Sequence, residues 1–486
     1  MRSLPAAVVL LSVAAVLAGC LKSSDDGASA PGKGIPSVSP DRLPDPHKEL
    51  DFANVVVGNH GAPEMHSIRA LHHGNYLLER IGWNPLVDKA NPGAAGTGWG
   101  AAGLWSHYAC VAQFAGTGAL AIVDIQDPTK PTVVAQVDDP LVNGDCQFTD
   151  DGDYLMAGAY IGPGPNPNPT GEQPLCPSGC PGGGGINVWD VHDKAHPSHI
   201  LYTDTGEYHT LHLWTNQRNE TYVVQAYSGH IYRFDAAGPA LVPVNQIQPM
   251  QHDMWISRHP ITHETLLYAG SGKGFVIYDF DGITLRGENA TQAQVGEWVP
   301  EGDPGVAPED LRQGCCGWHR QATVDQLIDG KAVAVVAGEA CGAGYTLPYF
   351  VMDVTDPSAP KVLSKWEVPG KPVSNDGEHL CEMSPHEFAV HDGYVVTGNY
   401  HAGVWLFDIG SHDRLLHPVT LGYYIPDQEP ATQSGPAGAQ DLTFPWNPFV
   451  WGAFFDERGY VLAGDFSSGV YLLGVPGLSG AAHPAA

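Results

Sequence analysis

The sequence predicts an all-β protein, a seven-bladed β-propeller in which an N-terminal strand completes the last blade. Three observations lead to this fold class. A short phrase made of a glycine, alternating apolar residues and an aspartate recurs along the chain, and a second apolar strand precedes each copy. The 486 residues also include 59 glycines and 41 prolines, which suit many tight turns. Recurrence at roughly the length of one four-stranded blade is typical of a propeller.

The recurring phrase sets the number of units. Its copies occupy residues 118–125 (GALAIVDI), 185–191, 229–235, 274–280, 348–354, 403–409 and, in degenerate form, 469–474. The shortest intervals between successive phrase aspartates are 45 residues, from Asp190 to Asp235, and 44 residues, from Asp235 to Asp279. Longer intervals contain insertions such as residues 162–184, and insertions of this kind are expected as loops at one face of the ring.

The strand before each phrase is apolar at nearly every position, as in residues 154–160 (YLMAGAY) and 394–400 (YVVTGNY). This pattern is expected when neighbouring blades cover both faces of a sheet. After the phrase comes a turn bounded by prolines, as in residues 127–131 and 356–360, and then a more polar outer strand such as residues 132–137. Each unit therefore supplies three strands in a fixed order, with the innermost strand before them.

The two ends of the array predict how the ring closes. The last unit stops near Leu473 without a clear fourth strand, whereas residues 51–58 (DFANVVVG) form an apolar strand that belongs to no unit. A propeller has to close to bury its end blades. We therefore expect residues 51–58 to complete blade seven.

The segments IVDIQDPTKP, VMDVTDPSAP and NVWDVHDKAHP resemble the LVIVD repeat of exported prokaryotic proteins, in which a strand ending in Asp precedes a DPxxP turn. The resemblance covers most of the chain after Trp99. It implies a β-propeller, often at the cell surface. The third and fourth copies depart from the pattern after Asp235 and Asp279, so the conformation of their turns stays open.

Residues 1–19 are interpreted as a lipoprotein signal peptide, with Arg2 at the positive start and an apolar run over residues 8–17. Residues 17–20 (LAGC) resemble the lipobox of prokaryotic lipoproteins, which implies a lipid on Cys20. The alternative is a soluble secreted protein. We expect residues 20–49 to be a flexible tether, 50–476 the propeller and 477–486 a disordered tail. The protein would then be exported and held at the outer face of the cell membrane, or in a periplasm or outer membrane.

The charge limits the partners. Lys and Arg together number 23 against 53 Asp and Glu, a formal charge of -30. Nucleic-acid binding is excluded because no surplus of cations is available to neutralise phosphates. We expect membrane contact only through the lipid anchor, and a partner that is a protein, a glycan or a small ligand.

Eight cysteines remain beside Cys20, and in an exported protein they are candidates for disulfides. Eight cysteines allow 105 connectivities, so the pairing stays open. Cys176 and Cys180 are candidates to close a small loop on themselves. Their interpretation as half of a metal site lacks a second pair of ligands.

The innermost strand of five successive units begins with a histidine or a cysteine. These residues are Cys146, His209, His252, His319 and His386. Equivalent positions in a propeller converge on the central channel, so four imidazoles and one thiol are expected around one opening. Imidazole binds copper and zinc well, and Asp253 and Glu387 could support such ligands. The arrangement resembles seven-bladed propellers that hold copper in a histidine-lined hub. The alternative is that each histidine bonds the backbone of the next blade.

Two functions follow from these patterns. The first is a lipid-anchored binding scaffold without enzymatic activity, which uses the inserted loops. The second is a redox or hydrolytic metalloenzyme built on the histidine ring. The sequence contains no nucleophile elbow, P-loop, dinucleotide fingerprint or EF-hand spacing.

Overall fold

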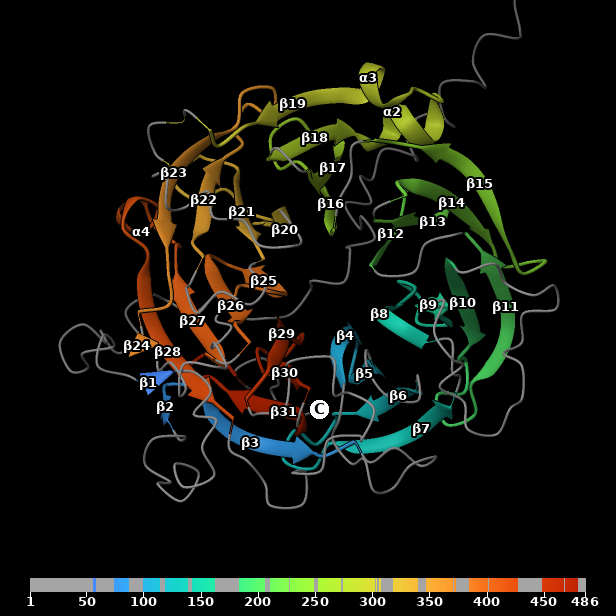
Figure 1. The fold of residues 1–486 in the computed structure, drawn as a ribbon, viewed down its shortest axis with the longest axis horizontal. Coiled ribbons are helices and arrows are strands. Elements are labelled where there is room, and N and C mark those ends of the chain that lie inside the picture. The colour runs from blue at the N-terminus through green and yellow to red at the C-terminus, as the bar shows by residue number, and fades with distance from the viewer. Residues whose placement is uncertain are drawn as a thin grey trace, which may run out of the picture.

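The computed structural model describes residues 56–57, 74–86, 99–113, 119–138, 142–161, 183–205, 210–226, 228–248, 252–271, 274–301, 303, 306, 318–339, 347–369, 371–372, 384–400, 402–426, 448–466 and 468–479. Within these residues seven antiparallel sheets stand around one axis, and the strands of each sheet follow one another outward from it (Figure 1). The prediction of a seven-bladed β-propeller is confirmed.

Blades one to six run from the innermost strand to the rim in chain order. Blades one and two contain β4 (Trp99–Trp105), β5 (Tyr108–Gln113), β6 (Ala119–Asp124) and β7 (Thr132–Asp138), then β8 (Val142–Phe148), β9 (Tyr154–Ile161), β10 (Gly183–Asp190) and β11 (Ser198–Asp204). Blades three and four contain β12 (Leu211–Thr215), β13 (Thr221–Gln225), β14 (His230–Asp235) and β15 (Ala240–Gln246), then β16 (Met254–Arg258), β17 (Thr265–Gly270), β18 (Phe275–Asp279) and β19 (Gln294–Trp298).

The later blades keep the same order. Blade five contains β20 (Trp318–Thr323), β21 (Val333–Gly338), β22 (Tyr349–Asp353) and β23 (Lys361–Trp366), and blade six contains β25 (Phe388–His391), β26 (Tyr394–Gly398), β27 (Val404–Asp408) and β28 (Val419–Ile425). Blade seven contains β29 (Val450–Phe455), β30 (Val461–Asp465), β31 (Gly469–Gly474) and the N-terminal β3 (Glu79–Asn84). The recurring phrase therefore forms the third strand of every blade, and the apolar strand before it forms the second.

An N-terminal strand closes the ring, as predicted, but the prediction that residues 51–58 form this strand was wrong. The fourth strand of blade seven is β3, which pairs antiparallel with β31 from Glu79 opposite Gly474 to Asn84 opposite Val470. Within residues 51–58 the structure describes only β1 (Val56–Val57), which pairs in parallel with β24 (Lys371–Pro372). Just before β3, β2 (Gly74–Tyr76) pairs with β28 at the rim of blade six. One N-terminal stretch thus binds the outer edges of both blades.

Seven hydrophobic clusters among the described residues fill the seven interfaces between blades. Each cluster draws its side chains mainly from two neighbouring sheets, for example Val188 of blade two with Leu211 of blade three, and Tyr349 of blade five with Phe407 of blade six. Both faces of a sheet are therefore buried, which explains why the second and third strands lack an alternating pattern.

The phrase aspartate ends its strand with a local hydrogen bond. The Oδ1 atom of Asp124 accepts from the backbone N–H of Gln126, and the same bond to the residue two positions later recurs at Asp190, Asp235, Asp353 and Asp408. A short carboxylate that bonds its own backbone in this way favours a turn. This local chemistry explains the repeated aspartate.

The turn after the phrase varies as its sequence does. In blade four a short helix pair, α2 (Phe280–Leu285) and α3 (Ala290–Ala293), replaces the proline-bounded turn, and in blade six α4 (His412–Leu416) does so. In blades one and five the turn keeps its two prolines, and its first proline lies against the outer strand of the preceding blade. A Cβ on Gly82 would lie 2.0 Å from the carbonyl oxygen of Pro128, and a Cβ on Gly296 would lie 2.1 Å from that of Pro357.

The strand ends that border the gaps in the described part of the chain lie at one face of the ring. From Gly74 to residue 479, each gap joins either the second strand of a blade to its third or the rim strand to the next innermost strand. Both kinds of connection leave the sheet at the same end. The aspartate turns lie at the opposite end. Among the described residues no helix is both long enough and apolar enough to cross a membrane.

Candidate metal centre

Three of the predicted histidines meet at the axis. His252 precedes β16, His319 lies in β20 and His386 precedes β25, so each comes from the start of the innermost strand in blades four, five and six. The ring centroids of His252 and His319 are 4.0 Å apart, and those of His319 and His386 are 4.1 Å apart. All three side chains are buried. The expectation that equivalent strand positions converge is met by these three residues.

A carboxylate faces the three imidazoles. Glu339 directly follows β21 of blade five and is buried. Its Oε2 atom lies 3.8 Å from Nε2 of His252 and 3.7 Å from Nε2 of His319, and its Oε1 atom lies 3.9 Å from Nε2 of His386. We call His252, His319, His386 and Glu339 the hub cluster. Its four side chains present three nitrogen donors and a carboxylate to one small volume.

The ring of His386 is held in one orientation. Its Nδ1 atom lies 2.9 Å from the carbonyl oxygen of Trp451 in blade seven. A carbonyl oxygen only accepts hydrogen bonds, so Nδ1 of His386 carries the proton. In the neutral ring the unprotonated Nε2 atom then faces Glu339 and is the atom that could bind a metal. The indole of Trp451 packs against the same ring, with 3.9 Å between centroids. Ligating histidines are commonly oriented by a bond of this kind from the other ring nitrogen.

A layer of buried charges lies one residue further along the same strands. Arg320 donates from its guanidinium to Oδ2 of Asp253 at 2.6 Å and from Nε to the carbonyl oxygen of Phe388 at 3.0 Å. Burial raises the pKa of Glu387 to about 7, and burial together with the nearby charge of Glu387 raises the pKa of Asp145 well above its usual range. Burial thus favours the protonated forms of both carboxyl groups. Asp253 and Glu387 thus interact with Arg320 and Asp145.

His212 lies apart from the hub cluster. It is buried, and its ring packs against Trp255 with 5.1 Å between centroids. Burial, with the positive charge of Arg320 as a second cause, lowers the pKa of His212 to about 3. His212 therefore stays neutral and acts as a packed core residue.

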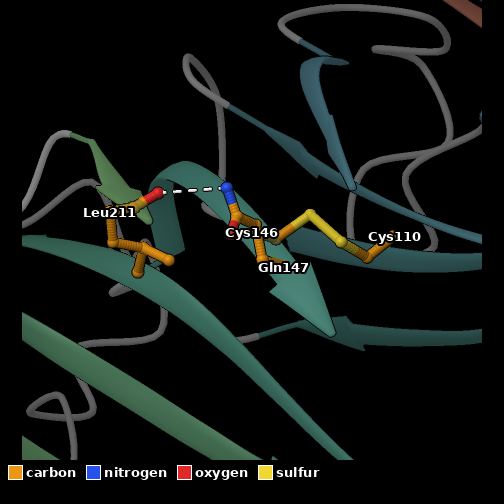
Figure 2. Close-up of a disulfide and its surroundings, with 4 residues drawn as sticks. All are labelled: Cys110, Cys146, Gln147 and Leu211. Carbon is orange, nitrogen blue, oxygen red and sulfur yellow. Dashed lines mark hydrogen bonds between the residues drawn. A yellow bond between two sulfur atoms is a disulfide. The ribbon is translucent and has the colours of Figure 1, made fainter. Parts of the chain in front are cut away.

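The structure corrects the expectation for Cys146. This residue lies in the innermost strand β8 as predicted, but its sulfur is joined to that of Cys110 in β5, with a Cα–Cα distance of 6.2 Å (Figure 2). A sulfur in a disulfide is not a thiolate ligand. Beside it, the Gln147 side chain donates to the carbonyl oxygen of Leu211 at 3.2 Å (Figure 2). This strand is thus linked to blade one and to blade three.

Four other predicted site residues lie outside the described residues. They are His209, Cys20, Cys176 and Cys180. The lipid on Cys20, the Cys176–Cys180 bridge and the place of His209 in the ring stay predictions.

The sequence reasoning missed Glu339, although a signal for it exists. The residue after the last glycine of the second strand is polar and buried in four blades, where it is Ser271, Glu339, Asn399 or Asp465. The three shorter side chains bond nearby groups: Ser271 Oγ accepts from the N–H of Gly274, Asp465 from that of Phe449, and Asn399 from the Tyr349 hydroxyl. Glutamate is longer and reaches the axis. The sequence signal for Glu339 was therefore a longer acidic side chain at a position where other blades have a shorter polar residue.

The donor set of the hub cluster fits a transition metal. Three imidazoles and one carboxylate suit zinc, copper, iron or nickel, and a hard ion such as calcium prefers oxygen ligands. With metal–ligand bonds of about 2.1 Å, neighbouring ligands of a tetrahedral site lie about 3.4 Å apart. The separations of 3.7 and 3.8 Å between Oε2 of Glu339 and the Nε2 atoms of His319 and His252 require only small side-chain shifts. His386 faces the other carboxylate oxygen, Oε1, at 3.9 Å and needs a larger shift to share one ion with them. His252, His319 and Glu339 place one ligand atom each within 4.8 Å of one another.

Known structures similar to this chain share little sequence with it. Sqt1 from Chaetomium thermophilum is 12% identical, with 82% of this chain and 99% of that chain covered and a TM-score of 0.46. The C-terminal WD40 domain of Sif2 is 8% identical, with coverages of 82% and 97% and a TM-score of 0.43. The periplasmic gluconolactonase PpgL of Pseudomonas aeruginosa is 13% identical, with coverages of 68% and 86% and a TM-score of 0.45. With identities of 8 to 13% and TM-scores below 0.5, no property of these proteins is carried over to this chain.

Comparison by sequence finds similarity in one segment of the chain. No curated protein sequence matches the chain. Residues 105–139, which contain β5, β6 and β7, match a family model described as the LVIVD repeat. The matched segment includes the phrase that ends in Asp124 and the turn of residues 127–131, which carried the resemblance in the sequence. The last three strands of blade one are therefore similar to an LVIVD repeat.

Proposed function

We propose that the protein binds a divalent transition metal ion at the hub cluster, as an exported propeller anchored to a membrane by lipid on Cys20. One observation carries the metal site. The carboxylate of Glu339 lies 3.7 to 3.9 Å from the Nε2 atoms of three histidines that come from three different blades. A rigid ring brings these groups together without the ordering cost that a flexible segment would bring.

The ligands sit in a setting that favours binding over solvation. All four side chains of the hub cluster are buried, and the His386 ring is fixed by the Trp451 carbonyl. A bound metal would offset the burial of the Glu339 charge, and it would supply Lewis-acid or one-electron chemistry there. The alternative role, in which the histidines only bond neighbouring backbone, accounts for His386 Nδ1 but leaves the convergence of three Nε2 atoms on one carboxylate unexplained.

The proposed location is supported by the chemistry of the disulfide. Cys110 and Cys146 are bonded in the interior of the protein. Disulfides persist in oxidising compartments outside the cytosol. This agrees with the lipoprotein signal expected for residues 1–19. A seven-bladed propeller is consistent with an interaction scaffold, and we propose that a protein, glycan or small-ligand partner would contact the face that carries the hub cluster.

Metal analysis of the protein purified without added metal tests the site. We expect close to one equivalent of a transition metal in the native protein and less than about a tenth in His252→Ala with His386→Ala, because two of four ligands are lost. His212→Asn is the matched control, since it removes a buried histidine outside the hub cluster and should keep the metal.

Two outcomes would end the metal proposal. One is a native protein that neither contains metal nor takes up Zn²⁺ or Co²⁺ after dialysis. The other is equal loading of the native protein and a folded double variant. If the double variant does not fold, Glu339→Gln serves in its place, because it keeps the side-chain volume and removes the charge.

The anchor needs a separate measurement. The full chain expressed in a bacterial host should partition into the detergent phase and carry a diacylglyceryl group on Cys20 by mass spectrometry. Cys20→Ser should release it into the aqueous phase. A native chain found in the aqueous phase with an unmodified Cys20 would contradict the anchor and leave the metal site untouched.

A further inference from the structure

We infer that Tyr400 is a positioning residue for the metal centre and sets its affinity by holding the Glu339 carboxylate against the three imidazoles. The inference rests on the proposed metal site and adds a residue that is not one of the four members of the hub cluster. The Tyr400 hydroxyl donates a hydrogen bond to Oε1 of Glu339, the same oxygen that faces Nε2 of His386.

The ring of Tyr400 has little freedom to move. It is 3% exposed and stacks on Phe449 with 4.1 Å between centroids and 18° between planes. The ring also packs against those of His386 and Trp451, with 5.1 Å and 5.9 Å between centroids. An aromatic side chain fixed by packing presents its hydroxyl at a defined point. The direction of the hydrogen bond to Glu339 is therefore set by blades six and seven together.

The backbone of Tyr400 is held in an uncommon conformation. Its φ is 44°, in the left-handed region that bulky residues rarely adopt. Two backbone hydrogen bonds to Val450 of blade seven, each 3.0 Å long, keep it there. Strain of this kind persists where the surroundings require one geometry, and it is often found at functional sites. In this conformation the side chain reaches Glu339 in blade five.

The hydrogen bond gives the two carboxylate oxygens different roles. A phenol beside a carboxylate acts as donor, and a bond to an ionised acceptor is stronger than one between neutral groups. With Oε1 held by Tyr400, the plane of the carboxylate is fixed and Oε2 points to His252 and His319. Loss of partners that orient metal ligands typically lowers metal affinity by about 10- to 100-fold.

Zn²⁺ titration of the metal-stripped full chain tests this role. In Tyr400→Phe the ring and its packing stay, and only the hydroxyl is lost. We expect the dissociation constant for Zn²⁺ to rise about 10- to 100-fold while the melting temperature of the metal-free protein changes little. Tyr349→Phe is the matched control, because this buried hydroxyl bonds Thr397 and Asn399 in the same region and does not touch Glu339. Its dissociation constant should stay within about twofold of the native value.

A double-mutant cycle separates positioning from general packing. If Tyr400 acts through the carboxylate, Tyr400→Phe should have little further effect on Zn²⁺ affinity in a Glu339→Gln background. A native protein that binds Zn²⁺ and a Tyr400→Phe variant that binds it equally well would overturn this inference and leave the metal site standing. An independent, additive effect in the cycle would overturn it as well. A native protein that binds no metal would remove both proposals. Should Tyr400→Phe fail to fold, Tyr400→Met, which also removes the hydroxyl and fills the buried space with a flexible apolar side chain, must show the same loss of affinity.

Discussion

The sulfur atoms of Cys110 and Cys146 are joined across the interface between blades one and two. Cys110 lies in the second strand of blade one and Cys146 in the innermost strand of blade two, 36 residues later. The bond adds a covalent link between two sheets that also meet through side-chain packing and through the hydrogen bond from the Trp105 indole N–H to the carbonyl oxygen of Asp150, 3.0 Å long. It constrains the unfolded chain as well as the folded interface.

Replacing both cysteines, Cys110→Ser with Cys146→Ser, should lower the free energy of unfolding by about 2 to 4 kcal/mol, the usual effect of a disulfide that closes a loop of this length. Guanidinium chloride unfolding of the oxidised proteins measures it. The metal content should be unchanged, because the bonded Cys146 is no ligand. A variant with native stability, or one that has lost its metal, would contradict this account.

Gly296→Ala should lower the free energy of unfolding by about 1 to 3 kcal/mol, a cost typical of an overpacked site. Its Cβ would lie 2.1 Å from the carbonyl oxygen of Pro357, and backbone cannot yield as a flexible side chain does. Gly238→Ala is the matched control, since no atom lies within 4 Å of a Cβ placed there, and its stability should stay within about 0.5 kcal/mol. Equal stability of the two variants would show that the turn of blade five does not pack on β19.

Truncation from the N-terminus should distinguish the two candidate closing strands. A chain that begins at Gly74 lacks residues 51–58 but keeps β3, and it should unfold cooperatively near the native temperature. A chain that lacks residues through Leu86 also loses β3 and the burial of Leu78 and Leu86, which contributes about 3 to 6 kcal/mol. We expect this shorter chain to be largely unfolded or aggregated by circular dichroism and size-exclusion chromatography. A destabilised chain from Gly74 would instead assign the closure to the earlier segment.

The error in the closing strand has a physical cause. A rim strand needs little apolar character because much of it faces solvent, and β3 carries Glu79 and Arg80 at exposed positions. Residues 51–58 look more like a strand because of three consecutive valines. The second and third strands were easier to predict, because blades on both sides bury them and their apolar runs repeat. Pattern therefore predicts the inner strands of a propeller better than its rim.

Only those residues of the candidate site that occupy equivalent positions in the repeats could be predicted from the sequence. His252, His319 and His386 occupy one strand position in three blades, so alignment of the units placed them together. Glu339 lies on a different strand, and its approach to the axis depends on side-chain length. The disulfide partner of Cys146 could not be predicted for the same reason. Alignment of the repeats shows which residues are equivalent, but it does not show contacts between residues at different strand positions.

The free energy of unfolding should depend on pH through Glu387. Burial raises its pKa to about 7 in the folded protein, against about 4.3 in an unfolded chain, so the folded state binds more protons between these values. The contribution of this group is fully present below about pH 4.3 and is lost as the pH rises toward 7, by at most about 1.4 kcal/mol per unit. Asp145, Asp253 and Arg320 are the charged groups around it.

Glu387→Gln removes this dependence because its amide stays neutral at every pH. We therefore expect the metal-free variant to gain stability relative to the metal-free native protein as the pH rises from about 4.5 to 7.5, by up to about 3 kcal/mol in total. Urea unfolding at several pH values measures the difference. His212, whose lowered pKa acts in the opposite direction as the pH falls below about 6.5, is present in both proteins and cancels. A flat difference for Glu387→Gln would mean that the buried carboxyl pair carries its charge without cost.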